Sequence, residues 1–367
     1  MTNKIENKTE VKKINAINNS DILFIYDAKM CNPNGDPDDE NKPRMDYETD
    51  RNLVSDVRLK RYIRDYLEDK GNPIFVAKVD EKTVDATQRL AYWIYKKILN
   101  DPNETKDRQK DAKEIEKTLQ QGKTPDAKDI VGLIKTEDEL LGAFIDVRLF
   151  GATMPIKGQR GESFTFTGPV QFNWGYSLNR VNIVESSTIS STFAGRTREG
   201  EGEQFGTFGK DYRVYYSLIA FHGIISGKRA EHTQLTANDI SLIQEALIKS
   251  IPLQATRSKI GQYPRLLIRV EYTDKETFIG DLRRYIKAEP VNVKENPVRD
   301  VSQIKLTMNK LITELIANKQ KINKIYYWQD KELIPKFCDL ITDSDFKSKL
   351  QFIEIEKKED IAGALKN

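Results

Sequence analysis

Carboxylates are the side chains with which this sequence could activate water or hold a metal ion. Four of them stand close together in the turn-rich segment CNPNGDPDDENKPR at 31–44: Asp36, Asp38, Asp39 and Glu40. Calcium loops of the EF-hand kind need a glycine at their sharp turn and a glutamate at their twelfth position. Asn41 stands in place of that glycine, and no glutamate closes the loop. We therefore expect neither a metal site nor a catalytic residue here.

Side chains for nucleophilic or zinc-assisted catalysis are scarce in these 367 residues. The two histidines, His222 and His232, lack partners at metal-binding spacing, and so do the two cysteines, Cys31 and Cys338. The glycine-rich signatures of nucleotide hydrolysis and dinucleotide binding do not occur, nor does GxSxG. The sequence predicts a protein that is not an enzyme and needs no cofactor, and two distant cysteines fit a reducing compartment.

The holding of phosphates is a second kind of chemistry, and the residues after the acidic segment favour it. The stretch SDVRLKRYIRDYL at 55–67 carries an apolar stripe with helical spacing: Leu59, Tyr62, Ile63, Tyr66 and Leu67. Arg58 and Arg61 project from the opposite side, with Lys60 and Arg64 on the flank. An ordinary solvated helix face would look the same. Because an asparagine-rich loop leads into this helix, we expect amides, backbone N–H groups and guanidinium groups to converge near one edge, where phosphates bind well.

The elements that must position these residues follow from hydrophobic periodicity. The expected strands and helices are, in chain order, a buried central strand at Asp21–Asp27, a helix at Ser55–Leu67, strands at Ala143–Phe150 and within Ser163–Leu178, a helix at Thr236–Ser250 and a strand at Leu266–Tyr272. Their order is strand, helix, strand, strand, helix, strand. It predicts an α+β fold built on a ferredoxin-like, RRM-like βαββαβ palm.

Two insertions are expected in this palm. The first is a charged helical finger, from Thr83 to about Leu140. The second is the glycine-rich segment Ser190–Tyr212, which cannot build a core and whose β-prone flanks predict a protruding β-hairpin thumb, a disordered surface loop being the alternative. The predicted division is 20–71 for the first part of the palm, 72–142 for the finger, 143–189 for palm strands, 190–212 for the thumb hairpin, 213–290 for the second part of the palm and 291–367 for a C-terminal appendage.

The overall charge is nearly balanced. With 59 Lys and Arg against 56 Asp and Glu, the net charge is +3, so a nucleic-acid surface must arise from segregation of charge rather than from an excess. The polar start MTNKIENKTEVKK lacks the apolar region of a signal peptide, and apolar runs such as Ile22–Tyr26 are too short to span a membrane. We expect a cytoplasmic protein with no membrane partner.

Five blocks of the sequence resemble the Cas-seven family, more closely its Csh-two and Csd-two branch. They are NPNGDPD at 32–38, PRMD at 43–46, SDVRLKRYIRDYL at 55–67, TGPVQFNWGYSLNRV at 167–181 and GTFGKDYRVYYSLIAFHGII at 206–225. The blocks keep their order, and the region beyond about Ile251 adds little to the resemblance.

The resemblance implies a crRNA-binding backbone subunit of a type I CRISPR Cascade complex, of the I-B kind. Such a protein polymerises along crRNA, holds the phosphate backbone and presents the spacer bases for pairing with target DNA. The implied partners are further copies of itself and the Cas-five, Cas-six, Cas-eight and small subunits of Cascade. Phosphate contacts suit this task, since contacts to base edges would restrict which guides could be held.

The resemblance also assigns RNA-binding residues. Contacts to the guide backbone are implied for Asn32, Asn34, Arg44, Arg58, Lys60 and Arg61. The second rank of candidates is Met154, Lys157, Gln171, Arg196, Lys210 and Arg213. Met154 could instead be a simple core residue.

Two rival functions stay open. Backbone subunits of the related type III complexes cut bound RNA with a loop aspartate, and Asp36, Asp38, Asp39 or Asp46 could serve a metal-dependent ribonuclease in the same way. Turn chemistry explains these aspartates equally well. The second rival is a generic single-stranded RNA-binding protein without CRISPR partners.

Overall fold

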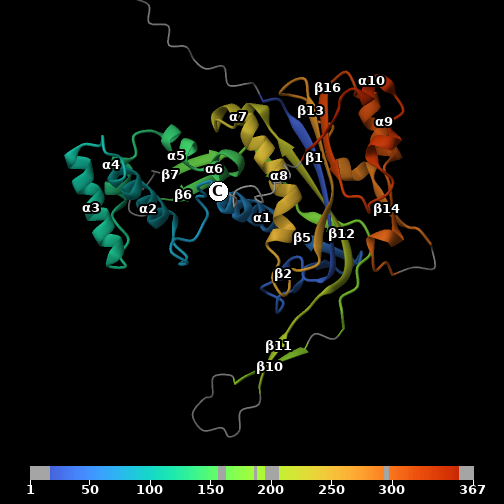
Figure 1. The fold of residues 1–367 in the computed structure, drawn as a ribbon, viewed down its shortest axis with the longest axis horizontal. Helices are drawn as coiled ribbons and strands as arrows, with labels where there is room; N and C mark the ends of the chain where they lie inside the picture. Colours follow the sequence, from blue (N-terminus) through green and yellow to red (C-terminus); the bar gives the residue numbers. More distant parts are fainter. Residues whose placement is uncertain (1–16, 156–162, 186–187, 195–205, 293–296, 355–367) are drawn as a thin grey trace, which may run out of the picture.

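A nine-stranded mixed sheet forms the centre of the protein (Figure 1). The computed structural model describes residues 17–155, 163–185, 188–194, 206–292 and 297–354. Across the sheet the strands are β17 (Leu350–Phe352), β16 (Ile322–Gln329), β13 (Gln262–Tyr272), β1 (Ser20–Cys31), β12 (Val214–Ile225), β9 (Gly175–Ser177), β5 (Arg51–Val54) and β4 (Met45–Asp46), with β8 (Val170–Phe172) also paired to β12. The α+β class agrees with the prediction from sequence.

Strand β1 lies at the middle of this sheet, antiparallel to both β12 and β13. Its side chains alternate between two hydrophobic clusters, with Ile22, Phe24 and Tyr26 in one and Leu23 and Ile25 in the other. A strand buried on both faces reads as a continuous apolar run rather than an alternating one. The prediction of a buried central strand from ILFIY is confirmed.

Helices α1 (Asp56–Asp69) and α8 (Ala237–Leu253) cover one face of the sheet (Figure 1). Helix α1 begins after Ser55, whose side chain accepts the backbone N–H of Arg58. The predicted apolar stripe of this helix is buried throughout. Helix α8 begins with a capping box between Thr236 and Asp239. Both helices lie where periodicity predicted them.

The other face is covered by residues near the C-terminus. Helices α9 (Asn309–Ala317) and α10 (Ser344–Lys347) pack there with the hairpin of β14 (Lys287–Pro290) and β15 (Ile304–Thr307). Because β16 and β17 join the central sheet, much of the predicted appendage completes the main core.

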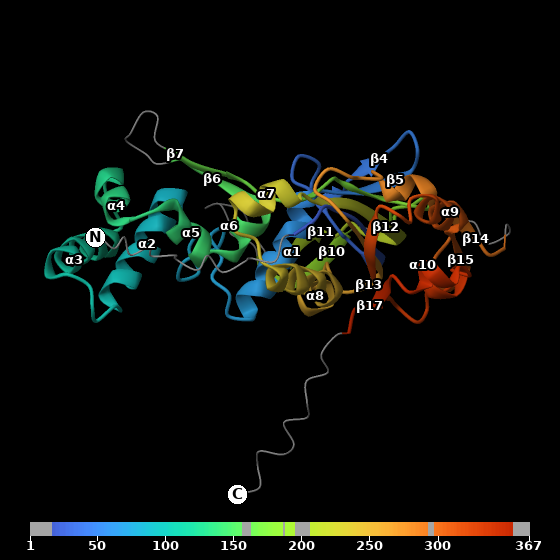
Figure 2. The same ribbon diagram turned by 90° about the horizontal axis from the view of Figure 1, so that it is seen from above.

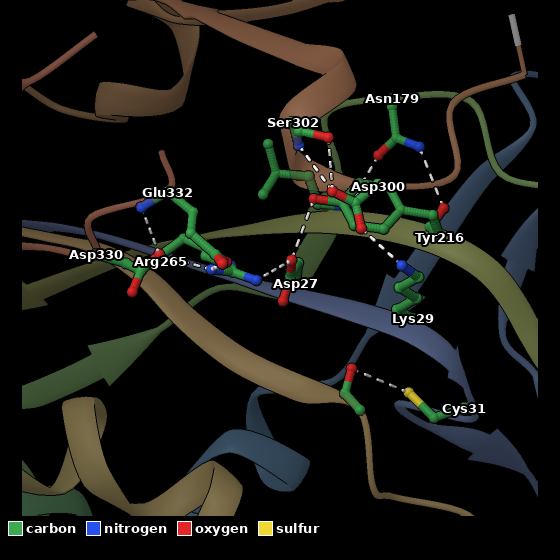
Figure 3. Close-up of polar contacts among 12 residues, drawn as sticks. Asp27, Lys29, Cys31, Asn179, Tyr216, Arg265, Asp300, Ser302, Asp330 and Glu332 are labelled. Carbon is green, nitrogen blue, oxygen red and sulfur yellow. Dashed lines mark hydrogen bonds and ion pairs between the residues drawn. The ribbon is translucent and has the colours of Figure 1, made fainter. Parts of the chain in front are cut away.

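Polar contacts join this C-terminal part to the central sheet (Figure 3). Lys29 of β1 forms an ion pair with Asp300 at 2.6 Å. Arg265 of β13 contacts Asp27 at 2.9 Å and both Asp330 and Glu332 at 2.6 Å. The C-terminal elements are therefore joined to β1 and β13 by charge as well as by apolar packing.

Helices α2 (Ala86–Leu99), α3 (Lys106–Gln120), α4 (Ala127–Leu133) and α5 (Glu137–Ala143) surround a hydrophobic cluster of their own. Figure 2 shows this helical lobe at one end of the molecule and the C-terminal elements at the other. In the described part of the chain no helix is both long and apolar enough to cross a bilayer.

The strand predicted at Ala143–Phe150 is wrong, because these residues end α5 and form helix α6 (Ile145–Phe150). Val147 packs into the cluster of the helical lobe, while Ile145 and Leu149 pack into the cluster under the sheet. A short segment between two apolar surfaces is apolar on most sides, so its periodicity does not distinguish helix from strand.

The region Ser163–Leu178 forms three short strands rather than continuous palm strands. Strand β7 (Ser163–Thr167) pairs with β6 (Gly151–Pro155) in a separate hairpin, and only β8 and β9 join the central sheet. At the break, an added Cβ on Gly168 would lie 2.0 Å from the carbonyl carbon of Phe150. Glycine is therefore required where the chain leaves the hairpin for the sheet.

A second hairpin, β10 (Thr188–Ala194) with β11 (Gly206–Lys210), projects below the sheet in Figure 1. The sequence predicts such a hairpin, and its first β-prone flank forms β10. The second strand of the hairpin is β11, inside the glycine-rich segment, whereas the predicted second flank at 214–225 is β12 of the central sheet; 195–205 lie outside the described residues. The short helix α7 (Gly227–His232) lies at the opposite end of the sheet.

Candidate nucleic-acid interface

The loop between β1 and α1 contains a small hairpin of β2 (Gly35–Asp36) and β3 (Lys42–Pro43). Asn32 is buried and donates from its side chain to the Asn41 carbonyl at 2.7 Å. A Cβ on Gly35 would lie 2.8 Å from that same carbonyl oxygen. The asparagine-rich motif therefore shapes the loop through internal contacts.

Asn34 joins this loop to helix α1. Its side-chain oxygen accepts hydrogen bonds from the backbone N–H of Ser55 at 2.9 Å and from the Ser55 hydroxyl at 3.0 Å. Ser55 is the N-cap residue of α1. Asn34 thus fixes where the helix begins relative to the loop.

Arg44 directly follows β3, and its backbone N–H donates to the Asn34 carbonyl at 3.1 Å. It contacts Asp36 at 3.1 Å, and its guanidinium carbon lies 5.7 Å from the ring centre of Trp174. Its Nε atom is buried and finds no hydrogen-bond partner within the described residues. Arg44 is therefore stacked and paired, with donor capacity left for an anion.

The basic residues of α1 do not form the free cationic face expected from the helical wheel. Arg64 pairs with buried Asp146 at 3.0 Å, and its side chain is only 13% exposed. Arg61 is exposed but pairs with Asp65 at 2.5 Å, one turn later on the same helix. Helical spacing places a side chain on a face but gives no information on the carboxylates that other segments bring to it.

Lys60 links α1 to strand β8. Its Nζ donates to Asp56 at 3.0 Å and to the side-chain oxygen of Gln171 at 3.0 Å, and its side chain is 12% exposed. Gln171 in turn donates to the carbonyls of Phe150 and Gly168. Two candidates from separate motifs are thus in direct contact.

Three other candidates lie partly or wholly outside the described residues. Met154 lies in β6 with its side chain outside the described part, and Lys157 and Arg196 lie wholly outside the described residues. Lys210 is exposed on β11, at the base of the projecting hairpin.

Arg213 joins the base of that hairpin to the central sheet. It pairs with Asp211 at 2.8 Å and donates to the carbonyls of Met30 at 2.8 Å and Arg257 at 3.1 Å. These partners belong to the end of β1 and to the segment between α8 and β13. Arg213 therefore brings three segments together where β1 ends.

Lys259 lies at the same junction, and we did not select it from the sequence. Its Nζ donates to the Asn32 carbonyl at 2.5 Å. Burial and the neighbouring Arg58 lower the pKa of Lys259 to about 8. Arg58 lies over the Tyr62 ring, with its guanidinium carbon 4.0 Å from the ring centre. The contact from Lys259 spans 227 residues of sequence, so no local motif could have identified it.

Cys31 lies in the same region, with its sulfur 3.8 Å from the Gly261 carbonyl (Figure 3). Burial raises the pKa of the Cys31 thiol to about 12. The thiol is therefore neutral at ordinary pH and gives no counter-charge to the cations beside it.

The acidic residues of the loop serve its turns and ion pairs. Asp36 accepts the backbone N–H of Asp38 and pairs with Arg44. The remaining contacts are Asp39 with Lys42, Glu40 with the Tyr212 hydroxyl and Asp46 with the Thr49 hydroxyl. Within the described residues, no group of three or more His, Cys, Asp or Glu is placed to hold a metal ion.

The fold is similar to that of a solved structure. A chain of a solved structure described as "CRISPR RNA-guided surveillance complex, pre-nicking" has the same fold, with a TM-score of 0.50 and 14% sequence identity. The match covers 85% of this chain and 93% of that chain. At this identity the likeness concerns the fold.

Sequence comparison defines the family. The family model for CRISPR-associated protein Cas7 matches residues 18–309. The CRISPR-associated protein Cas7 of Haloferax volcanii is 30% identical over 333 residues, which cover 86% of this chain and 88% of that protein. The chain belongs to the Cas7 family, so the resemblance of the five motif blocks to that family is confirmed. The family match continues past Ile251, where those blocks gave no signal.

Proposed function

We propose that this protein is the backbone subunit of a type I CRISPR Cascade complex, of the I-B kind, acting in the cytoplasm. It polymerises along crRNA, holds the phosphate backbone and presents the spacer bases for pairing with target DNA. The observation that carries this proposal is the convergence, in a Cas7-family chain, of Asn32, Arg58 and Arg213 where β1 ends and the projecting hairpin begins.

The palm of this subunit is ferredoxin-like. The supporting features are the strand order β13, β1, β12, β8 and the position of α1 and α8 on one face. Helices α2 to α5 then correspond to the finger, and β10 with β11 to the thumb. A thumb that projects from the sheet can reach the RNA segment held by a neighbouring copy.

The proposed contacts suit guide binding without base readout. Arg44, Arg58 and Arg213 offer guanidinium groups, which bind phosphates in a forked geometry. Phosphate contacts carry no sequence information, so any spacer could be held and its bases left free for target DNA.

A backbone subunit also needs partners. Repetition of one head-to-tail contact between copies gives an open filament, and the RNA can limit its length. Cas-five, Cas-six, Cas-eight and the small subunits are the proposed further partners in the complex. Target DNA is contacted by way of the crRNA.

The test is binding of the full chain to single-stranded RNA. We expect elongated assemblies in electron micrographs whose length increases between a 30- and a 60-nucleotide RNA, and equal affinity for two unrelated sequences of the same length under matched salt. Sharp discrimination between the two sequences would contradict phosphate holding. Assemblies that form without RNA, or that ignore its length, would contradict polymerisation along a guide.

The ribonuclease alternative has a separate test. Because the loop carboxylates form turns and ion pairs, we expect no time-dependent cleavage of bound RNA with Mg²⁺ or Mn²⁺. Cleavage that disappears in both Asp38→Ala and Asp46→Ala, but persists in an exposed control such as Asp69→Ala, would support the ribonuclease instead.

A further inference from the structure

Lys259 is a half-buried cation with few partners. It lies between α8 and β13, and among the described residues its Nζ makes one hydrogen bond, which it donates to the Asn32 carbonyl. A lysine ammonium group has three N–H donors. Two of these donors therefore remain for another acceptor.

The neighbour of Lys259 is Arg58, a second cation with unused hydrogen-bond donors. Arg58 is half-buried over Tyr62, and its buried Nε has no hydrogen-bond partner in the part of the chain that the structure describes. Neither Arg58 nor Lys259 has a carboxylate within ion-pair distance among the described residues. Two like charges withdrawn from water repel each other, and burial without a counter-charge is costly.

The acidic groups nearby are already engaged. Asp211 accepts from Arg213 and lies 3.5 Å from Arg257. Asp27 contacts Arg265, and the Cys31 thiol is neutral. The pair formed by Arg58 and Lys259 thus has an excess of positive charge that this chain does not balance locally.

We propose that Lys259 and Arg58 together bind one phosphodiester group of single-stranded RNA, and that Lys259 is a guide-binding residue outside the sequence motifs. This inference rests on the proposed function. A phosphodiester supplies one negative charge and several acceptor oxygens, which match the free donors of the two side chains. The hydrogen bond to Asn32 would place Lys259 against the loop that approaches the RNA.

A measurable proton change follows from this arrangement. The pKa of Lys259 is lowered to about 8, so at pH 8 part of the free protein carries the neutral amine. A bound phosphate favours the charged form. Binding at pH 8 should therefore take up a fraction of a proton for each Lys259 that contacts RNA.

The experiment uses the full chain with a single-stranded RNA of fixed length. Affinity is measured between 50 and 200 mM salt for the parent, Lys259→Met, Lys259→Arg and the control Lys228→Met. Lys228 is an exposed lysine of α7, at the end of the sheet away from the thumb. Calorimetry at pH 8 in buffers of different ionisation enthalpy measures proton uptake, and circular dichroism checks folding.

The expected results separate binding from a purely structural role. Lys259→Met should bind about tenfold more weakly, and its slope of log affinity against log salt should fall in magnitude by about 0.7. Lys259→Arg should keep the slope but lose the proton uptake, since arginine stays charged. Lys228→Met should match the parent in both measurements.

Four outcomes would overturn the inference. An unchanged salt slope in Lys259→Met, or proton uptake that persists in Lys259→Arg, would refute the phosphate contact while leaving guide binding by the protein intact. If inorganic phosphate stabilises the parent but not Lys259→Met, and the RNA slope is unaffected, the pair binds free phosphate instead of RNA. Absence of RNA binding by the parent would refute the proposed function together with this inference.

Discussion

Replacement of Asn34 tests whether the asparagine motif acts through the start of helix α1. The side-chain oxygen of Asn34 accepts two hydrogen bonds from Ser55, one from its backbone and one from its hydroxyl. Asn34→Ala removes both, and each is worth about 1 kcal/mol net. The free energy of unfolding should therefore fall by about 2 kcal/mol. For a chain of 367 residues this corresponds to a decrease in Tm of roughly 2 to 3 °C.

Asn34→Asp is the matched control. A carboxylate keeps both acceptor positions, loses only the bond that the Asn34 amide donates to the Gly35 carbonyl at 3.2 Å, and lies near the N-terminus of α1, where negative charge is favourable. We expect Asn34→Asp to unfold within about 0.5 kcal/mol of the parent. If the RNA passes the loop, however, the added charge should weaken RNA binding, and more so at low salt.

Calorimetric melting and salt-dependent anisotropy of labelled RNA measure the two effects. The reasoning is refuted if Asn34→Ala melts within 0.5 °C of the parent, because then the two bonds to Ser55 do not hold the helix start. If Asn34→Asp binds RNA as the parent does at every salt concentration, the loop does not approach the phosphates.

Two further predictions concern Lys60 and Asp27. Lys60→Met should lower the magnitude of the slope of log RNA affinity against log salt by about 0.7. An unchanged slope would mean that Lys60 is only a structural partner of Gln171. Methionine is preferable to glutamate here, because a glutamate would repel Asp56. Burial raises the pKa of Asp27 to about 6 in spite of Arg265. Folding therefore favours the neutral carboxyl group, and the stabilisation that this group gives is present below about pH 4 and is lost as the pH rises through 6. Asp27→Asn should abolish this dependence in urea unfolding between pH 4 and 7, and an unaltered pH profile would contradict it.

The central elements of the fold could be predicted because one packing surface determines each of them. Strand β1 is apolar on both faces, and α1 presents one continuous stripe to the sheet. Helix α6 could not be predicted, since its six residues contact two separate cores. The place of β16 in the sheet could not be predicted either, because the residues that it pairs with in β13 lie 50 to 63 positions away in sequence.

The candidate site also has a part that the sequence indicates and a part that only the tertiary structure reveals. The family resemblance names Asn34, Lys60 and Gln171 as candidates, and the structure adds that Lys60 contacts Gln171 while Asn34 accepts from Ser55, the N-cap residue of α1. The sequence could not reveal that Arg64 pairs with Asp146, which belongs to a different helix. Nor could it reveal Lys259, whose environment exists only after the loop and the segment before β13 have come together.

These contacts explain how a chain with a net charge of only +3 can present a cationic site. Carboxylates are not depleted near the loop, but Asp36 and Asp39 are bound to Arg44 and Lys42, close to them in sequence. Such short-range pairs consume the negative charge locally. Arg58 and Lys259 meet only through tertiary structure, at a place where the described residues bring no carboxylate to pair with them. Charge is thus segregated by the ion pairs that the fold permits and not by the composition of the chain. A replacement that frees Asp36 or Asp39 from its ion pair should therefore weaken RNA binding, although Arg58 and Lys259 both remain in place.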